Sequence, residues 1–122
     1  MARIAVIDDS RLMRRVLRGY LEHGGHTVEE WEPGAAMEIY ERTQASDPDL
    51  LITDFQMPGA NGATVAKMAR KAKPSLPILV MTALRDPEVI ELLKRSQVTA
   101  IMNKPCSEAD LLEAVAKALG NT

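Results

Sequence analysis

The chain has 122 residues and 46% of them are hydrophobic, so it is long enough and apolar enough to form one domain with a buried core over residues 1–122. Its formal charge of −2 argues against direct nucleic-acid binding, because proteins that hold a phosphate backbone usually carry a basic excess. The single cysteine, Cys106, excludes an intrachain disulfide, and no apolar run approaches the roughly 18 residues of a membrane span, so we expect a cytoplasmic protein without membrane insertion.

Short apolar runs alternate along the chain with longer segments of helical period. The runs are too brief for helices, and this alternation is typical of a parallel sheet covered by helices on both faces. The predicted strands run from Arg3 to Ile7, Thr27 to Trp31, Leu50 to Thr53, Ile78 to Thr82 and Thr99 to Met102.

The first intervening segment, from Arg11 to Glu22, is a predicted amphipathic helix. Its charged residues, Arg14 among them, fall on one side of a helical wheel, and apolar residues such as Leu12 and Val16 fill the rest. We therefore expect the arginines in solvent and the apolar face on the sheet. A contact of the arginines with an acidic partner stays open as a second interpretation.

Turn and cap residues predict where the helices begin and end. Gly24-Gly25 supplies the left-handed residue that commonly ends a helix, and Asp47-Pro48 separates the second helix from the third strand. Asp86-Pro87 places a capping carboxylate before a proline at the first helical position. The spacing from Ser107 to Asp110 is that of a capping box, which predicts the start of the last helix.

Three acidic side chains follow two of the predicted strands. Asp8 and Asp9 come after the first strand and Asp54 after the third, and in an open parallel sheet the carboxyl ends of the strands form the ligand-binding edge. Each acid alone is explained by a helix cap or a turn. Together they repel by several kcal/mol at an effective dielectric of about 20. A hard cation such as Mg²⁺, which prefers oxygen ligands and leaves room for a phosphate oxygen, resolves that repulsion.

Two further polar residues follow the other strands at the same edge. Thr82 ends the fourth strand and Lys104 follows the fifth. A carboxylate can accept a phosphoryl group as an aspartyl phosphate when cations neutralise the charge, and Lys104 is placed to supply fixed positive charge while Thr82 bonds a phosphoryl oxygen. Taken alone, Thr82 is an ordinary strand residue and Lys104 a solvated lysine.

Several motifs occur in the order and spacing of a known family. The chain resembles the receiver domain of two-component response regulators, including its chemotaxis-type members, from Arg3 to Leu119. The resemblance implies a flavodoxin-like, doubly wound α/β fold with five helices and five parallel strands in the order 2-1-3-4-5. The motifs are Val6-Ile7-Asp8-Asp9-Ser10, Leu51 to Pro58, Asn61-Gly62, Val80-Met81-Thr82-Ala83 and Lys104-Pro105.

The resemblance also implies a phosphoacceptor and a metal site. Asp54 would accept a phosphoryl group from a phosphohistidine of a histidine kinase or a phosphotransfer protein. Asp9, Asp54 and the backbone carbonyl of Gln56 would ligate Mg²⁺, and Asp8 would assist through bound water. The chain would catalyse its own phosphorylation and dephosphorylation without being an enzyme that acts on a separate substrate.

A switch follows from the same resemblance. Lys104 would pair with a phosphoryl oxygen, Thr82 would move toward the phosphoryl group, and the Lys104-Pro105 peptide bond would be cis. The surface of the fourth helix, fifth strand and fifth helix would then bind an unknown downstream effector protein in one state. We expect a monomer in the unphosphorylated state.

One departure from the family pattern keeps alternatives open. Many receivers carry Tyr or Phe three residues before the lysine, where this chain has Ile101, which cannot reproduce aromatic gating. The switch then runs through Thr82 and backbone shifts or signals weakly. A receiver-like interaction module that is never phosphorylated is one alternative. An aspartyl-phosphate phosphatase is a weaker one, because Asp54-Phe55-Gln56 lacks the second acid of such enzymes.

The remaining candidates for chemistry receive plainer interpretations. His23 and His26 lie at the edge opposite the acids, and we assign them no catalytic or metal role. Cys106 is interpreted as a packing residue, with the alternative that nearby Lys104 lowers the pKa of its thiol.

Overall fold

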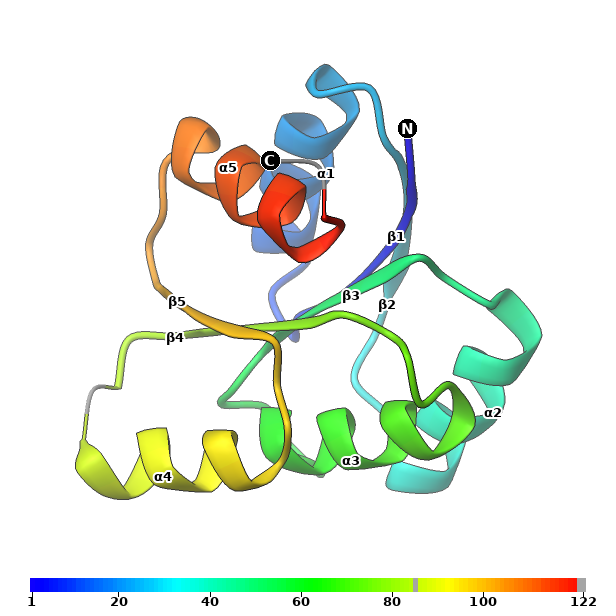
Figure 1. The fold of residues 1–122 in the computed structure, drawn as a ribbon, viewed down its shortest axis with the longest axis vertical. Helices are drawn as coiled ribbons and strands as arrows, with labels where there is room; N and C mark the ends of the chain where they lie inside the picture. The colour runs from blue at the N-terminus through cyan, green and yellow to red at the C-terminus, as the bar shows by residue number, and fades with distance from the viewer. Residues whose placement is uncertain (85, 121–122) are drawn as a thin grey trace.

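The computed structural model describes residues 1–84 and 86–120, in which five strands and five helices alternate along the chain (Figure 1). The strands are β1 (Arg3–Ile7), β2 (Thr27–Trp31), β3 (Leu50–Asp54), β4 (Ile78–Thr82) and β5 (Ala100–Asn103). The helices are α1 (Arg11–His23), α2 (Ala36–Ser46), α3 (Gly62–Ala72), α4 (Pro87–Arg95) and α5 (Glu108–Ala118).

The strands form one parallel sheet in the order β2-β1-β3-β4-β5, which confirms the predicted doubly wound, flavodoxin-like fold. Three strand boundaries differ from prediction by one residue, and one of them is the start of β5 at Ala100 instead of Thr99. β3 continues through Asp54, which pairs with Met81, and β5 ends at Asn103, which pairs with Thr82. These pairings carry the backbone of the acid-bearing strand to the same edge as the end of β4.

Helices cover both faces of the sheet and enclose two cores. In Figure 1, α1 and α5 lie on one face, and α2, α3 and α4 lie on the other. Alternate strand residues supply the two sides: Ile4 and Val6 pack with α1 and α5, whereas Ala5 and Ile7 pack with the other three helices. β3 and β4 are buried along their whole length, which explains their nearly continuous apolar sequences. Among the described residues, no helix combines the length and the apolar content that crossing a membrane requires.

Most of the predicted helix ends are found. The hydroxyls of Ser10 and Ser107 accept hydrogen bonds from the N–H groups of Met13 and Asp110, at the starts of α1 and α5. Gly25, with φ of 91°, follows α1 in the left-handed region. The side-chain cap predicted for Asp86 is wrong: the residue precedes α4, but its carboxylate makes no capping hydrogen bond, and Pro87 begins the helix as expected.

The orientation of α1 corrects the prediction of a solvated arginine face at one position. The other arginines of this helix are exposed or partly exposed, as predicted. Arg14 is only 7% exposed, whereas Leu12 is 75% exposed and Val16 is 37% exposed. The helix turns this way because β2 presents Glu30 to its arginines, and an ion pair can be buried where an unpaired charge cannot. Hydrophobic periodicity gives the width of an apolar face, and the neighbouring strand decides which part of the helix lies inward.

Candidate functional site

Three carboxylates meet at the carboxyl edge of the sheet. Asp8 and Asp9 lie in the loop between β1 and α1, and Asp54 is the last residue of β3. The three residues each offer a carboxylate oxygen within 4.8 Å of the others. β1 and β3 are paired neighbours, so their parallel register brings together acids separated by more than forty positions of sequence. The predicted cluster is therefore present in the structure.

One lysine contacts two of these acids. Lys104 Nζ lies 3.1 Å from Asp54 Oδ2 and 3.2 Å from Asp8 Oδ2. Its backbone N–H donates to the Thr82 carbonyl oxygen at 3.1 Å, which ties the loop after β5 to the end of β4. The Lys104-Pro105 peptide bond is cis, as predicted. The fixed positive charge thus stands inside the cluster.

The charges of the cluster do not balance. Asp8 is 2% exposed and Asp54 is buried, while Asp9 is exposed. Burial raises the pKa of Asp54 above its usual range, and the contact with Lys104 only partly offsets it. Burial alone would lower the pKa of Lys104, but the hydrogen bonds and charges of Asp54 and Asp8 outweigh it and raise the pKa. The lysine therefore stays charged, and one cation faces three acids.

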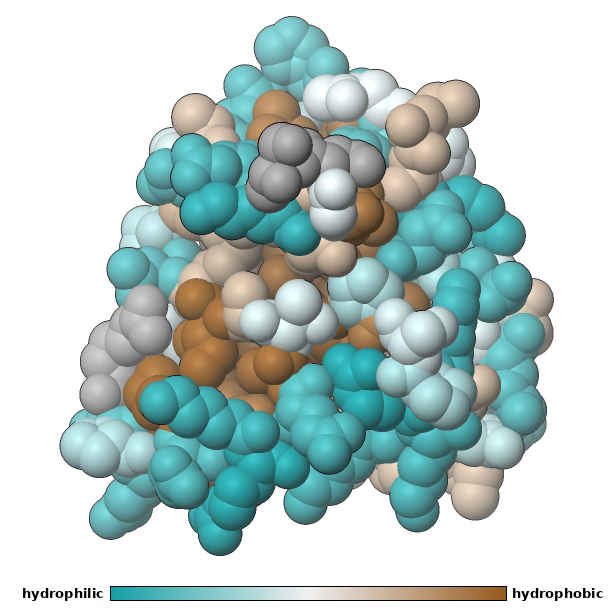
Figure 2. Space-filling model, viewed as in Figure 1, coloured by the Kyte–Doolittle hydropathy of each residue, from teal (hydrophilic) through white to brown (hydrophobic). Residues whose placement is uncertain are grey.

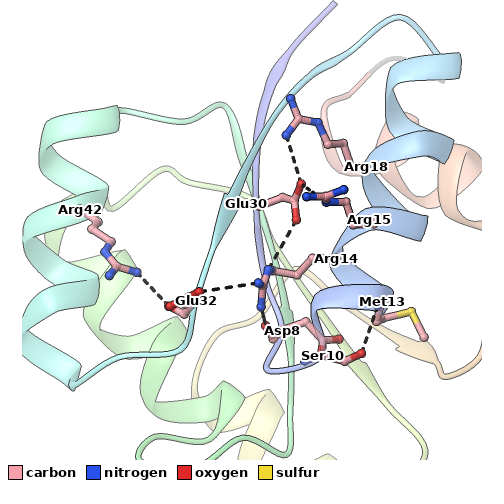
Figure 3. A network of polar contacts seen from close by, with 9 residues as sticks. All are labelled: Asp8, Ser10, Met13, Arg14, Arg15, Arg18, Glu30, Glu32 and Arg42. Atoms are coloured by element: carbon pink, nitrogen blue, oxygen red, sulfur yellow. Dashed lines mark hydrogen bonds and ion pairs between the residues drawn. The ribbon is translucent and has the colours of Figure 1, made fainter.

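A second set of contacts fixes Asp8 from its own loop. Asp8 Oδ1 accepts a hydrogen bond from Ser10 N–H at 2.8 Å, and the Asp8 carbonyl oxygen accepts one from Arg14 Nη1 at 2.6 Å. Figure 3 shows Arg14 lying between Asp8 and two glutamates of the β2 region, Glu30 and Glu32. Helical periodicity alone does not predict this position of Arg14, although the acidic run at the end of β2 is the signal that α1 meets carboxylates there.

Thr82 and Gln56 lie at the same edge, with different surroundings. Thr82 is buried, and its hydroxyl oxygen accepts a hydrogen bond from Leu84 N–H at 2.9 Å. Gln56 is exposed in the turn after β3. The hydrogen bond from Gly62 N–H to the Phe55 carbonyl oxygen, 2.8 Å long, closes this turn. The roles assigned to Thr82 and to the Gln56 carbonyl stay predictions.

A hollow of about 390 Å³ opens beside the cluster. It gives a small group in solvent access to Asp9, the exposed acid of the three. Its walls combine charged side chains of the loop and α1 with residues that follow β2 and β3. The lining residues are Asp9, Arg11, Arg14, Glu32, Pro33 and Pro58.

Ile101 and Cys106 are both half-buried, and they pack on opposite faces of the sheet. Ile101 is half-buried and, like Leu84 and Val89, packs against the core on the α4 side of the sheet, where Figure 2 shows an apolar area over β4 and β5. Cys106 is half-buried and packs against the α1 and α5 core, as predicted. The alternative of a lowered thiol pKa is wrong, because burial and then the charge of Asp110 raise the pKa of Cys106.

The sequence profile of the response regulator receiver domain matches residues 4–116. The chain belongs to the response regulator receiver domain family. The receiver protein CpdR of Brucella abortus is 31% identical over 119 residues that cover 98% of each chain. The regulators NtrC of Escherichia coli and MprA of Mycobacterium ulcerans are 37% and 41% identical over 81 residues, or 66% of this chain, which span only 17% and 34% of those longer proteins.

Solved receiver structures have the same fold. The chemotaxis protein CheY4 of Vibrio cholerae superposes with a TM-score of 0.86 at 27% identity, covering 97% of this chain and 98% of that one. A CheY-like receiver domain of Methanospirillum hungatei gives a TM-score of 0.88 at 23% identity, over 98% and 94% of the two chains. The family recognition made from the motifs is confirmed. Within this receiver domain, the structure brings Asp8, Asp9, Asp54 and Lys104 together.

Proposed function

We propose that this receiver domain is a phosphorylation-controlled switch of a two-component system. A carboxylate oxygen of Asp54 attacks the phosphorus of a phosphohistidine on a histidine kinase or phosphotransfer protein. The phosphorus–oxygen bond forms, the phosphorus–nitrogen bond breaks, and the leaving imidazole nitrogen takes up a proton. Water later hydrolyses the aspartyl phosphate. The chain acts on no separate substrate, and we do not class it as an enzyme.

The observation that supports this proposal most strongly is the contact of Lys104 with both Asp54 and Asp8 inside a cluster of three acids. A phosphoryl group is itself anionic, so a carboxylate can accept it only beside positive charge. Lys104 supplies that charge at 3.1 Å from the accepting side chain. We propose that the lysine pairs with a phosphoryl oxygen once the phosphate is in place.

The chemistry of the donor set fits Mg²⁺. Carboxylate oxygens within 4.8 Å of one another suit a hard cation that takes one or two carboxylates together with a phosphate oxygen. We propose that Asp9, Asp54 and the Gln56 carbonyl oxygen hold the ion, with Asp8 acting through bound water. When bound, Mg²⁺ supplies positive charge against the phosphoryl oxygens. Asp9 makes no ion pair within residues 1–84 and 86–120, so its carboxylate stays available to a cation.

We propose that Thr82 carries the signal away from the site. Its hydroxyl oxygen accepts from Leu84 N–H, and an accepting hydroxyl keeps its own hydrogen for donation to a phosphoryl oxygen. That donation favours one arrangement of the loop after β4 and so changes the surface of α4, β5 and α5, where a downstream effector protein binds one state. With Ile101 in the aromatic position, the shift passes through Thr82 and the loop backbone.

We further propose that residues 1–122 act as one cytoplasmic receiver domain that is monomeric before phosphorylation. The two cores already cover both faces of the sheet, so a second copy is not needed to bury apolar surface. A free cysteine suits the reducing interior of the cell. Sedimentation of the protein with and without a phosphoryl donor tests the monomeric state.

The test of phosphoryl transfer uses a small donor and intact mass. Phosphoramidate has the phosphorus–nitrogen bond of a phosphohistidine, and we expect it to add one phosphoryl group to the wild-type protein in the presence of Mg²⁺. Asp54→Asn removes the accepting oxygen with little change of shape and is expected to gain none. Asp110→Asn, an exposed carboxylate in α5, serves as the matched control and should be modified like the wild type.

Three results would contradict the proposal. A wild-type protein that gains no phosphoryl group is an interaction module outside phosphoryl control. If Asp54→Asn gains as much phosphoryl adduct as the wild type, another residue is the phosphoacceptor. A phosphorylation rate that is unchanged after chelation with EDTA would show that the reaction does not need Mg²⁺. Turnover of an aryl phosphate by the wild type would favour the phosphatase alternative.

A further inference from the structure

Arg14 is a buried arginine beside the acidic cluster. Its Nη1 donates to the Asp8 carbonyl oxygen at 2.6 Å, and its side chain is 8% exposed. Its Nε lies 3.5 Å from Glu30 Oε1, and its Nη2 lies 4.0 Å from Glu32 Oε1. In Figure 3 the guanidinium group stands between the end of β1 and the two glutamates. The arginine thus joins the loop of Asp8 to the β2 edge of the sheet.

Arg14 is costly for the stability of the fold. The Nε group is buried and has no hydrogen-bond partner among the described residues, because the 3.5 Å approach of Glu30 is an ion pair without hydrogen-bond geometry. An unsatisfied buried donor destabilises a protein, and an apolar residue of similar volume often serves a core better than a buried ion pair. Packing alone therefore does not account for an arginine at this position.

The arginine completes a three-point restraint on Asp8. The main-chain oxygen of Asp8 is held by Arg14, one carboxylate oxygen by Ser10 N–H at 2.8 Å, and the other by Lys104 Nζ at 3.2 Å. Asp9 follows directly, so the same restraint fixes the direction in which the chain leaves the sheet. Residues that hold ligand-bearing groups in place control metal affinity as strongly as many ligands do.

The other end of the arginine is anchored as well. Glu30 lies 3.1 Å from Arg18 Nη1 and 3.7 Å from Arg15 Nε, and its own side chain is 15% exposed. Two arginines thus hold the glutamate that faces Arg14, which makes Glu30 a fixed support on β2. The contacts therefore run from α1 through Glu30 of β2 and Arg14 to the main chain of Asp8.

We infer that Arg14 is a positioning residue of the acidic cluster: by holding the Asp8 carbonyl oxygen against β2, it sets the spacing of Asp8 and Asp9 relative to Asp54. This inference rests on the proposed function, because the spacing matters for a bound cation and a phosphoryl group. Without Arg14 the loop keeps its carboxylates but holds them less firmly. Cation binding then weakens, while the chemistry at Asp54 recovers once the cation saturates.

The experiment measures Mg²⁺ binding by titration calorimetry on the full chain, separately from phosphorylation. We expect Arg14→Gln to weaken Mg²⁺ binding about tenfold, in line with the loss of other outer supports of metal ligands. Arg14→Lys keeps a cationic donor for the Asp8 carbonyl and is expected to stay within about threefold of the wild type. Arg95→Gln, an exposed arginine in the last turn of α4, removes the same charge outside the hollow beside Asp9, and this matched control should bind Mg²⁺ like the wild type.

Phosphorylation by phosphoramidate adds a readout that general loss of stability would not give. For Arg14→Gln we expect the Mg²⁺ concentration for half-maximal rate to rise about tenfold, and the rate at saturating Mg²⁺ to return to within about twofold of wild type. If Arg14→Gln does not fold, Glu30→Gln carries the test. It leaves the arginine in place but loosens its support, and an affinity about threefold weaker is expected.

The outcomes separate this inference from the proposed function. A wild-type protein that binds no Mg²⁺ overturns both. A wild-type protein that binds Mg²⁺, with a folded Arg14→Gln or Glu30→Gln variant of unchanged affinity, overturns the role of Arg14 alone. Equal weakening in Arg95→Gln would show a bulk charge effect and would also overturn it. Circular dichroism and urea unfolding establish which variants are folded.

Discussion

The two edges of the parallel sheet hold their charges in different ways. At the amino-terminal edge, polar groups are matched: Arg3 N–H donates to Asp49 Oδ2 at 2.8 Å, and Lys73 Nζ lies 2.9 Å from Asp47 Oδ1 and 2.7 Å from the Pro48 carbonyl oxygen. At the carboxyl edge, three carboxylates lie together and Lys104 pairs with two of them, Asp8 and Asp54. One edge is built from satisfied pairs, and the other holds an excess of one charge.

This difference separates what the fold needs from what the function needs. Satisfied pairs stabilise a loop or leave stability unchanged, and nothing more is required to explain them. Like charges a few ångströms apart destabilise the folded state, and a protein keeps such a group only where a ligand brings the opposite charge. The carboxyl edge is therefore where removal of an acid should raise stability and lower function, whereas the amino-terminal edge should respond in stability alone.

The largest expected effect comes from removing the shared cation. Lys104→Met leaves Asp8 and Asp54 buried without a positive partner, and we expect the metal-free protein to lose about 2–3 kcal/mol of unfolding free energy. Added Mg²⁺ should restore part of the loss, because the ion supplies charge to the same acids. Urea unfolding with and without Mg²⁺ measures both. Lys117→Met, on the exposed face of α5, should stay within about 0.5 kcal/mol of wild type, and equal losses in both variants would contradict the argument.

The turn after β3 shows how tightly the acid-bearing strand is held. A Cβ at Gly62 would lie 2.9 Å from the Asp54 carbonyl oxygen and 3.0 Å from Phe55 Cα, both main-chain atoms that cannot move aside cheaply. We expect Gly62→Ala to destabilise the protein by about 2 kcal/mol. Gly19→Ala is the matched control, because a Cβ there meets nothing within 4 Å and alanine favours the helix interior. Chemical denaturation should show changes in the free energy of unfolding of opposite sign for the two variants. An unchanged free energy of unfolding in Gly62→Ala would contradict the predicted steric clash.

Sequence patterns predicted the residues of the carboxyl edge well because the parallel arrangement of the strands alone decides which residues lie there. Once the apolar runs are taken as parallel strands, Asp8, Asp54, Thr82 and Lys104 must follow strand ends, and strand ends of a parallel sheet share one edge. The parallel registers of β1 with β3 and of β4 with β5 bring the residues that follow these strands close together. Strand boundaries missed by one residue did not matter, because the side chains at the edge stayed the same.

The amphipathic helix was the harder problem. A helical wheel shows that charged residues share a side, but burial depends on what the neighbouring strand presents. Val6 pairs with Glu30 in the register of β1 and β2, which places an acid under α1 and draws Arg14 inward. Local rules could not give that pairing. They also could not show that burial, and then the charge of Asp110, raises the pKa of the Cys106 thiol, against the alternative interpretation in which Lys104 lowers it.

A smaller effect of opposite sign is expected at Asp9. This carboxylate is exposed and adds to the repulsion without pairing to Lys104 in the described part of the chain, so Asp9→Asn should stabilise the metal-free protein by about 1 kcal/mol. The same change removes a proposed Mg²⁺ ligand and should abolish most of the stabilisation by added Mg²⁺. Thermal unfolding at several Mg²⁺ concentrations tests both statements. A destabilised metal-free variant would mean that Asp9 is structural.

The smallest effect lies at the amino-terminal edge and depends on pH. Ala2 N–H donates to His26 Nδ1 at 3.1 Å, and burial, then the charge of the amino terminus, lowers the pKa of His26 below its ordinary value of 6.5. Because the unfolded chain binds this proton more readily, the stability from His26 is present above about pH 6.5 and is lost as the pH falls below it. His26→Asn keeps an acceptor that does not titrate, so its stability relative to wild type should rise on acidification. Urea unfolding of the two proteins from about pH 7.5 to about pH 5 measures this, and a difference that does not change with pH would show that His26 stays neutral for another reason.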